Sequence, residues 1–279
     1  MSEFAEFRIE YGPIVITGIE RRGDGTPIVL LHGAGGNALC FKPMLGPLGP
    51  RPMIALDMPG HGGSTDALSW EMEPLAELVY SISRRVVKER AIWGGHSWGG
   101  KLAAMIAAMH PETTDALLLI DPSPAGGIAI PAELFVDVTF AGELGPWASS
   151  EKAAASVSNL PQYTNWNEDL ARAFERGLVR GADGMIRARI SRETLIAACA
   201  EAGRDCSEII RRVSCRTHFV VADESLGWQE AINFGLLPHA TRSVIRSNHW
   251  LMAGNPAELN RAVASWLATG EEELAREAT

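Results

Sequence analysis

Short apolar runs bounded by turn residues recur along the chain and alternate with segments of helical periodicity. We predict strands over six of these runs, at 27–31, 52–56, 91–93, 116–120, 218–221 and 243–245. Most of the runs are continuously apolar, which is typical of parallel strands covered on both faces. Two further short runs flank Gly12-Pro13 within residues 7–20 and indicate a hairpin. Helical patterns at 73–87, 98–109 and 256–267 complete the prediction of a doubly wound, mostly parallel eight-stranded α/β sheet with helices on both faces.

One long interval lacks strand-like runs. Between the sixth strand and Cys215 the helical signals lie at 132–138, 150–157, 168–178, 192–202 and 207–213. A structureless loop of this length is uncommon inside a compact domain, so we predict a helical cap inserted after strand 6. The expected organisation is a core of residues 1–121 and 216–269, a cap of residues 122–215, and a flexible C-terminal tail of residues 270–279.

The pentapeptide Gly95-His96-Ser97-Trp98-Gly99 follows an apolar strand and precedes an Ala- and Met-rich helix. This arrangement matches the G-x-S-x-G nucleophile elbow, in which a strained turn exposes the serine hydroxyl above the sheet. The glycines are needed because strand and helix approach closely there. We therefore interpret Ser97 as a nucleophile.

A serine nucleophile needs a base, and the chain has seven histidines. His32, His61 and His96 lie in glycine-rich turns. The other candidates outside the last loop are His110 at a helix end, His218 at a strand start and His239 in a surface turn. His249 alone follows the last predicted strand, where loops form the ligand crevice of an open sheet. It is the predicted general base.

The oxyanion of an acyl-transfer intermediate needs two N–H donors. The residue after the nucleophile, Trp98, is expected to supply one. The loop after the first parallel strand reads His32-Gly33-Ala34-Gly35-Gly36-Asn37, and we expect the second from Ala34. This loop lacks the lysine and the spacing of a phosphate-binding loop.

Taken together, His32-Gly33, the Asp57–Gly62 segment with Ser64, the Ser97 elbow and Asn248-His249-Trp250 resemble the α/β-hydrolase fold superfamily. The chain is most similar to its single-domain, helical-capped esterase and lactonase members. The resemblance implies a serine hydrolase with a Ser–His–acid triad and no cofactor or metal. His32, Gly33, Trp98 and Trp250 are the expected substrate contacts.

The position of the triad acid departs from the usual pattern of that superfamily. Most relatives place it after the seventh strand, three residues beyond a glycine, and those positions are Ser225 and Ala222 here. Some members instead take the acid from the end of strand 6, where this chain has Asp121. We favour Asp121, with Glu224 and then Asp223 as alternatives.

Composition adds limits to this interpretation. The formal net charge of −9 comes from scattered acidic residues, which makes nucleic acid an unlikely partner. We see no signal peptide and no run of about 20 apolar residues for a membrane span. Four cysteines without metal spacing indicate reduced thiols in the cytoplasm. A monomer or homodimer acting on a small molecule is expected.

The predicted reaction is cleavage of an ester, lactone or amide-like bond in a small, partly apolar molecule through an acyl-enzyme. Cofactor-free oxygenation, carbon–carbon bond hydrolysis and lyase chemistry use the same groups and stay open as alternatives. Aspartate-nucleophile chemistry is disfavoured because position 97 is serine. The substrate itself depends on the cap.

Overall fold

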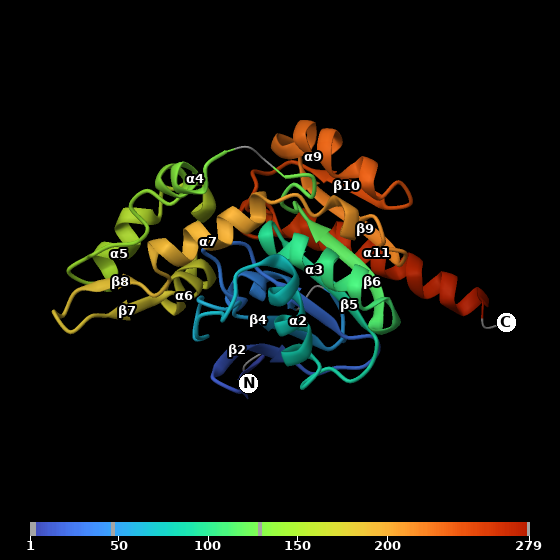
Figure 1. Ribbon diagram of the computed structural model, residues 1–279, viewed down its shortest axis with the longest axis horizontal. Helices are drawn as coiled ribbons and strands as arrows, with labels where there is room; N and C mark the ends of the chain where they lie inside the picture. Colours follow the sequence, from blue (N-terminus) through green and yellow to red (C-terminus); the bar gives the residue numbers. More distant parts are fainter. Residues whose placement is uncertain (1–3, 46–47, 128–129, 278–279) are drawn as a thin grey trace.

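The computed structural model describes residues 4–45, 48–127 and 130–277 and centres on one eight-stranded sheet (Figure 1). In spatial order the strands are β1 (Ala5–Tyr11), β2 (Ile14–Arg21), β4 (Met53–Leu56), β3 (Ile28–Leu31), β5 (Ala91–His96), β6 (Thr114–Ile120), β9 (Arg216–Ala222) and β10 (Thr241–Ile245). The β1–β2 and β2–β4 pairs are antiparallel and the other pairs are parallel. The predicted fold class is confirmed.

Helices cover both faces of the sheet because the apolar strands present side chains alternately to each face. Val29 and Leu31 pack in the cluster that contains helices α2 (Met72–Ser83) and α3 (Trp98–Met109). Ile28 and Leu30 pack in the cluster on the opposite face. That second cluster includes residues of η1 (Ala38–Phe41), α1 (Lys42–Leu45), α10 (Leu251–Gly254) and α11 (Pro256–Glu277).

The segment between β6 and β9 lies to one side of the sheet and carries most of its helices there (Figure 1). We call residues 122–215 the cap segment. Its helices are α4 (Ala132–Thr139), α5 (Ser150–Val157), α6 (Glu168–Arg176), α7 (Arg192–Gly203) and α8 (Ser207–Ile210). Two small apolar clusters hold it together, one around Phe140 and Leu195 and one around Phe174.

Two parts of the chain differ from the sequence prediction. The cap segment contains a hairpin of β7 (Leu178–Arg180) and β8 (Ile186–Ala188), although no strand was expected between 122 and 215. Helix α11 continues to Glu277 and so enters the tail expected at residues 270–279, of which residues 278–279 lie outside the described residues. The longer helix is consistent with a run of good helix formers, Glu, Leu, Ala and Arg, after Gly270.

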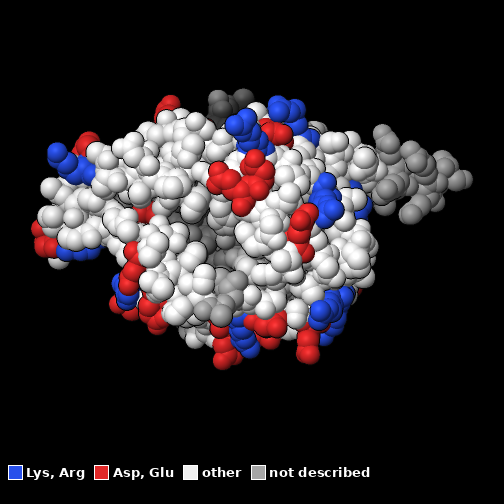
Figure 2. All heavy atoms as spheres, turned by 90° about the horizontal axis from the view of Figure 1, so that it is seen from above, with Lys and Arg blue, Asp and Glu red and all other residues white. Residues whose placement is uncertain are grey.

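Charged side chains on the face drawn in Figure 2 form small groups between large uncharged areas, and no broad basic surface appears there. In the described ranges, no helix combines the length and apolar character that a membrane crossing requires.

Candidate active site

Ser97 lies at the turn between β5 and α3 in a strained backbone conformation, with φ 53° and ψ −123°. The turn closes tightly against the neighbouring chain. A Cβ atom on Gly95 would lie 2.4 Å from the Gly99 carbonyl oxygen, and one on Gly99 would lie 2.2 Å from the Leu31 carbonyl oxygen. Both glycines are therefore required by steric contact, and the turn has the geometry of a nucleophile elbow.

Asp121 follows β6 directly and lies against the loop between β10 and α10. Its Oδ2 atom is 2.6 Å from Nδ1 of His249. The Asp121 side chain is fully buried, and the His249 side chain is 30% exposed. A positive φ of 40° at Asp121 turns the chain sharply at the strand end. A buried carboxylate at this distance fixes the ring orientation of a histidine and favours the tautomer with the proton on Nδ1.

Three further donors surround the Asp121 carboxylate. The Ser225 hydroxyl donates to Oδ2 at 2.6 Å, and the Gln229 side-chain amide donates to Oδ1 at 3.2 Å. The Ala222 N–H group donates to Oδ1 at 3.4 Å. Ser225 occupies the position where most relatives were expected to carry the acid, and here it hydrogen-bonds the acid instead. The sequence patterns did not indicate that Ser225 or Gln229 contacts Asp121.

The two alternative acids do not contact His249 in the described structure. Asp223 is exposed and accepts a hydrogen bond from the Ser247 N–H group at 3.0 Å. Glu224 is exposed in the short 3-10 turn η4 (Asp223–Ser225). Of the three carboxylates considered, the structure brings only Asp121 to His249.

His96 contacts His249 as well. Its Nε2 atom is 2.8 Å from the His249 carbonyl oxygen, and the two rings are 4.7 Å apart. Burial, and to a smaller extent the nearby His249, lower the pKa of His96 to about 3. A neutral His96 that donates from Nε2 therefore anchors the backbone of the loop that carries His249.

Ser97 has a second serine beside it. Among the described residues, the hydrogen-bond partner of the Ser97 hydroxyl is Ser123 at 3.4 Å rather than His249. Ser123 also donates its N–H group to the Ser97 carbonyl oxygen at 3.0 Å. This distance is long for a bond between two hydroxyls, so little holds the Ser97 hydroxyl in that rotamer.

Two buried histidines shape the glycine-rich loop after β3. His32 Nε2 accepts from the Met58 N–H group at 2.9 Å, and its Nδ1 is 2.7 Å from the Gly33 carbonyl oxygen. His61 Nε2 accepts from the Gly35 N–H group at 3.1 Å. Burial is the main cause that lowers the pKa of His32 to about 3 and that of His61 to about 4. Both rings are thus neutral and organise the loop that contains Ala34.

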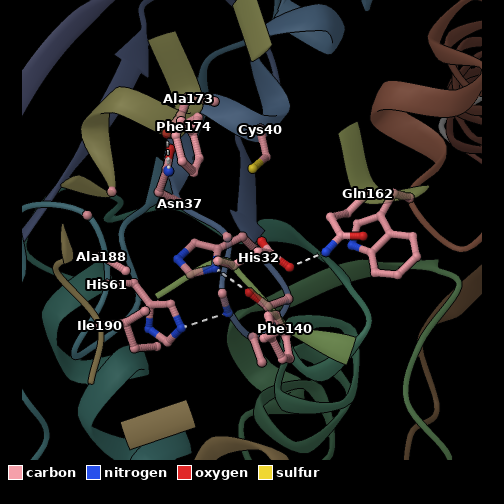
Figure 3. Close-up of a pocket in the computed structure, with 18 of the residues that line it drawn as sticks. His32, Asn37, Cys40, His61, Phe140, Gln162, Ala173, Phe174, Ala188 and Ile190 are labelled. Atoms are coloured by element: carbon pink, nitrogen blue, oxygen red, sulfur yellow. Dashed lines mark hydrogen bonds between the residues drawn. The ribbon is translucent and has the colours of Figure 1, made fainter. Parts of the chain in front are cut away.

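A pocket of about 110 Å³ opens between this loop and the cap segment (Figure 3). His32, Gly33 and Ala34 line it on the core side, with His96 and Trp250, the neighbours of Ser97 and His249. The cap segment contributes mainly apolar side chains, among them Phe140, Phe174, Ile190 and Leu195. The pocket thus lies next to the neighbours of the candidate reacting groups and is mainly apolar on the side of the cap segment.

Trp98 differs from the expected substrate contact. Its side chain is fully buried in the core, 5.8 Å from His61 and 6.3 Å from Trp70 between ring centroids, and does not line the pocket. Its N–H group lies in the first turn of α3, where backbone donors have no partner within the helix. Only the backbone of Trp98 therefore suits a role at the site.

Within the described ranges, no group of three or more His, Cys, Asp or Glu side chains could hold a metal ion.

Known proteins resemble the chain in family, sequence and fold. The model of the Alpha/beta hydrolase family matches residues 28–262. The chain is 36% identical over 100 residues to a pimeloyl-[acyl-carrier protein] methyl ester esterase of Pectobacterium carotovorum, covering 36% of this chain and 38% of that protein. It is 28% identical over 123 residues to the 2-(acetamidomethylene)succinate hydrolase of Mesorhizobium japonicum, covering 43% and 44%. The matches thus span well under half the length of these curated relatives.

Solved structures agree over nearly the whole chain. E-2-(acetamidomethylene)succinate hydrolase superposes with a TM-score of 0.81 at 21% identity, covering 95% of this chain and 99% of that one. A thioesterase domain from the curacin biosynthetic pathway superposes with a TM-score of 0.74 at 18% identity, with the same coverages. At these identities the likeness shows a shared fold.

Proposed function

Because the chain belongs to the alpha/beta hydrolase family, we propose that it is a serine hydrolase with Ser97, His249 and Asp121 as its catalytic triad. The proposed substrate is an ester, lactone or amide-like bond in a small, partly apolar molecule. The observation that carries the proposal is the 2.6 Å contact between the buried Asp121 carboxylate and His249, on the same sheet edge as the strained Ser97 turn.

In the first half-reaction the Ser97 hydroxyl turns from Ser123 toward His249 and attacks the carbonyl carbon of the substrate. His249 takes the hydroxyl proton on Nε2 as the bond forms, and Asp121 stabilises the imidazolium through Nδ1–H. The N–H groups of Trp98 and Ala34 stabilise the oxyanion of the tetrahedral intermediate. When that intermediate collapses, His249 gives the proton to the leaving alcohol or amine, and the acyl group stays on Ser97.

In the second half-reaction water replaces the leaving group. His249 removes one proton from the water, the hydroxide attacks the acyl carbon, and the proton returns to Ser97 as the acid product leaves. Ser225 and Gln229 donate to the Asp121 carboxylate throughout. These donors hold the Asp121 carboxylate in place beside Nδ1 of His249. The proposed reaction needs no cofactor.

The pocket limits the substrate. Among the described residues, no lysine or arginine lines it, so a dicarboxylate such as the succinate in the name of one relative finds no countercharge on them. Apolar lining from the cap segment suits a compact hydrocarbon group instead. We propose that residues 122–215 act as a cap that covers the core and determines which substrates bind. Gly33, His32 and Trp250 would then lie beside the scissile bond.

A cytoplasmic monomer or homodimer fits the same proposal. Cys40, Cys199, Cys206 and Cys215 are free thiols, which suits a reducing compartment. The net charge of −9 favours a small molecule over nucleic acid as the partner.

The proposal is tested with a fluorophosphonate probe and a panel of p-nitrophenyl esters, lactones and aryl amides. We expect the probe to label wild-type protein and not Ser97→Ala, and turnover to fall by at least ~10³ in that variant. Thermal unfolding of Ser97→Ala serves as the control for folding. Turnover that survives Ser97→Ala would overturn the hydrolase mechanism, and consumption of dioxygen by that variant would favour the cofactor-free oxygenase.

A further inference from the structure

One buried carboxyl group lies in the pocket but away from the proposed triad. Glu143, in the loop after α4, is 8% exposed and lines the pocket together with Gln162 and Tyr163. The Tyr163 hydroxyl donates to Oε2 at 3.0 Å, and the Gln162 side-chain amide donates to Oε1. In Figure 3 a dashed line marks the bond from Gln162, which lies across the pocket from His61.

Among the described residues, the groups that act on the pKa of Glu143 are Tyr163 and Gln162, and neither is a cation. No lysine or arginine lines the described part of the pocket. The two neutral donors occupy one position on each carboxylate oxygen, and a carboxylate can accept about four hydrogen bonds. A buried carboxylate without a countercharge is costly unless a ligand supplies that charge.

The surrounding titratable groups do not supply it. The pocket-lining histidines His32, His61 and His96 have pKa values lowered to between about 3 and about 4, mainly by burial. Burial raises the pKa of the Cys40 thiol. Burial also raises the pKa of Tyr163. These five groups therefore stay neutral from pH 5.5 to pH 8, and Glu143 is the group beside them that is charged at pH 8.

We propose that Glu143 is a specificity-determining residue that pairs with a positively charged group on the substrate. The pocket would then select small cationic esters or amides over neutral or anionic ones of the same shape. This inference rests on the proposed function, because the same pocket contains the loop of Ala34 and the neighbours of Ser97 and His249. Two observations on the described residues support it: each carboxylate oxygen of Glu143 accepts one hydrogen bond, and no lysine or arginine lines the pocket.

The test compares ligands that differ in charge and not in shape. Choline esters and 3,3-dimethylbutyl esters of one acid form such a pair, as do p-nitrophenyl esters whose acyl chains end in trimethylammonium or tert-butyl. At pH 8 we expect wild-type protein to favour the cationic member by about tenfold or more in kcat/KM, and acyl chains that end in carboxylate to be poorest. The preference should fall to about one in Glu143→Gln.

The matched control is Glu133→Gln on α4, which removes the same charge from an exposed position of the cap segment outside the pocket. It should keep the preference of the wild type. A wild-type ratio at or below one, or a ratio that Glu143→Gln leaves unchanged, would overturn the inference.

Two further measurements separate this result from folding and from the proposed reaction. Calorimetric binding of choline and of 3,3-dimethylbutan-1-ol to Ser97→Ala reports the charge preference without catalysis. The same binding ratio in protein with intact Glu143 should fall at pH 5.5, where that carboxyl takes up a proton. A binding preference for the cationic ligand without Ser97-dependent turnover would contradict the proposed function and leave this inference standing. Turnover of neutral esters without a preference for cationic ones would contradict this inference and leave the proposed function standing.

Discussion

At the scale of the residue, the proposed triad depends on which carboxylate accepts a hydrogen bond from His249. Asp121→Asn keeps the shape of the side chain, but its amide can donate to Nδ1 and thereby stabilise the wrong tautomer of the ring. We expect kcat to fall by up to ~10⁴. Glu224→Gln changes an exposed residue without contact to His249 and should cost less than twofold. Steady-state kinetics on a p-nitrophenyl ester measures both, and equal losses in the two variants would contradict the assignment of Asp121.

Glu143 gives a second prediction at this scale. Burial is the main cause that raises its pKa from 4.5 to about 7, while the hydrogen bonds from Tyr163 and Gln162 oppose the shift. Between these pH values the folded protein keeps a proton that the unfolded chain has lost. The free energy of unfolding therefore decreases with rising pH in this window, by roughly 3 kcal/mol from this group.

Glu143→Gln removes that titration. Urea unfolding of both proteins at pH 5 and pH 8, without ligand, should show the variant gaining stability relative to wild type at the higher pH. If the free energy of unfolding changes equally in the two proteins between pH 5 and pH 8, the pKa of Glu143 is not raised in the ligand-free protein.

At the scale of the element, the turn between β5 and α3 has the strictest steric requirement. Alanine at position 99 would place its Cβ 2.2 Å from the Leu31 carbonyl oxygen, and backbone atoms cannot move away cheaply. We expect Gly99→Ala to lower the free energy of unfolding by more than ~4 kcal/mol or to prevent folding. Gly227→Ala on α9 (Leu226–Ile232) is the control, because nothing lies within 4 Å of its new Cβ. It should stabilise by up to about 1 kcal/mol, as chemical denaturation can show.

Part of the site could be predicted from sequence because its signals are local. The glycines around Ser97 and the position of His249 after a strand are local signals, and the predicted parallel strands were found because their apolar runs are continuous. Ser225 and Gln229 carry no local signal, since they reach Asp121 from 104 and 108 residues away through the β6–β9 pairing. Their roles follow from tertiary structure alone.

In the cap segment, a hairpin was missed although a local signal for it was present in the sequence. Its β7–β8 hairpin has strands of three residues, too short for a periodicity test, although Asp183-Gly184 at its turn is a hairpin signal that could have been used. The sequence prediction assigned no element to residues 179–191, between the helical signals at 168–178 and 192–202. The helical signals of the cap segment coincide with α4, α5, α6, α7 and α8, whereas the two three-residue strands were missed.

At the scale of the whole molecule, one buried ion pair joins the cap segment to the core. Arg176 at the end of α6 contacts both carboxylate oxygens of the fully buried Asp57, with Nη2 2.8 Å from Oδ2, and its Nη1 is 3.1 Å from Glu6 on β1. Asp57 also accepts from the N–H groups of Ala38 and Gly63 at 2.9 and 3.1 Å. Burial by itself would raise the pKa of Asp57, but the hydrogen bonds and the charge of Arg176 outweigh it and hold that pKa below its ordinary value.

Removing Arg176 should therefore loosen the cap and destabilise the core together. Arg176→Met keeps the apolar stem but leaves the Asp57 charge buried without its partner, which costs about 3–5 kcal/mol in comparable pairs. The control is Arg172→Met on the same helix, whose exposed pair with Glu168 is worth at most about 1 kcal/mol.

The pH dependence distinguishes this ion pair from simple loss of packing. Because the folded pKa of Asp57 is lowered, the pair stabilises the protein at pH values above the ordinary pKa of aspartate, and that stability is lost as the pH falls through the folded pKa. The difference in unfolding free energy between wild type and Arg176→Met should thus be largest near pH 7 and shrink toward pH 3. A difference that stays constant over this range would mean that Arg176 contributes only its stem. If limited proteolysis then cleaves Arg176→Met within residues 122–215 sooner than Arg172→Met, the ion pair holds the cap over the pocket.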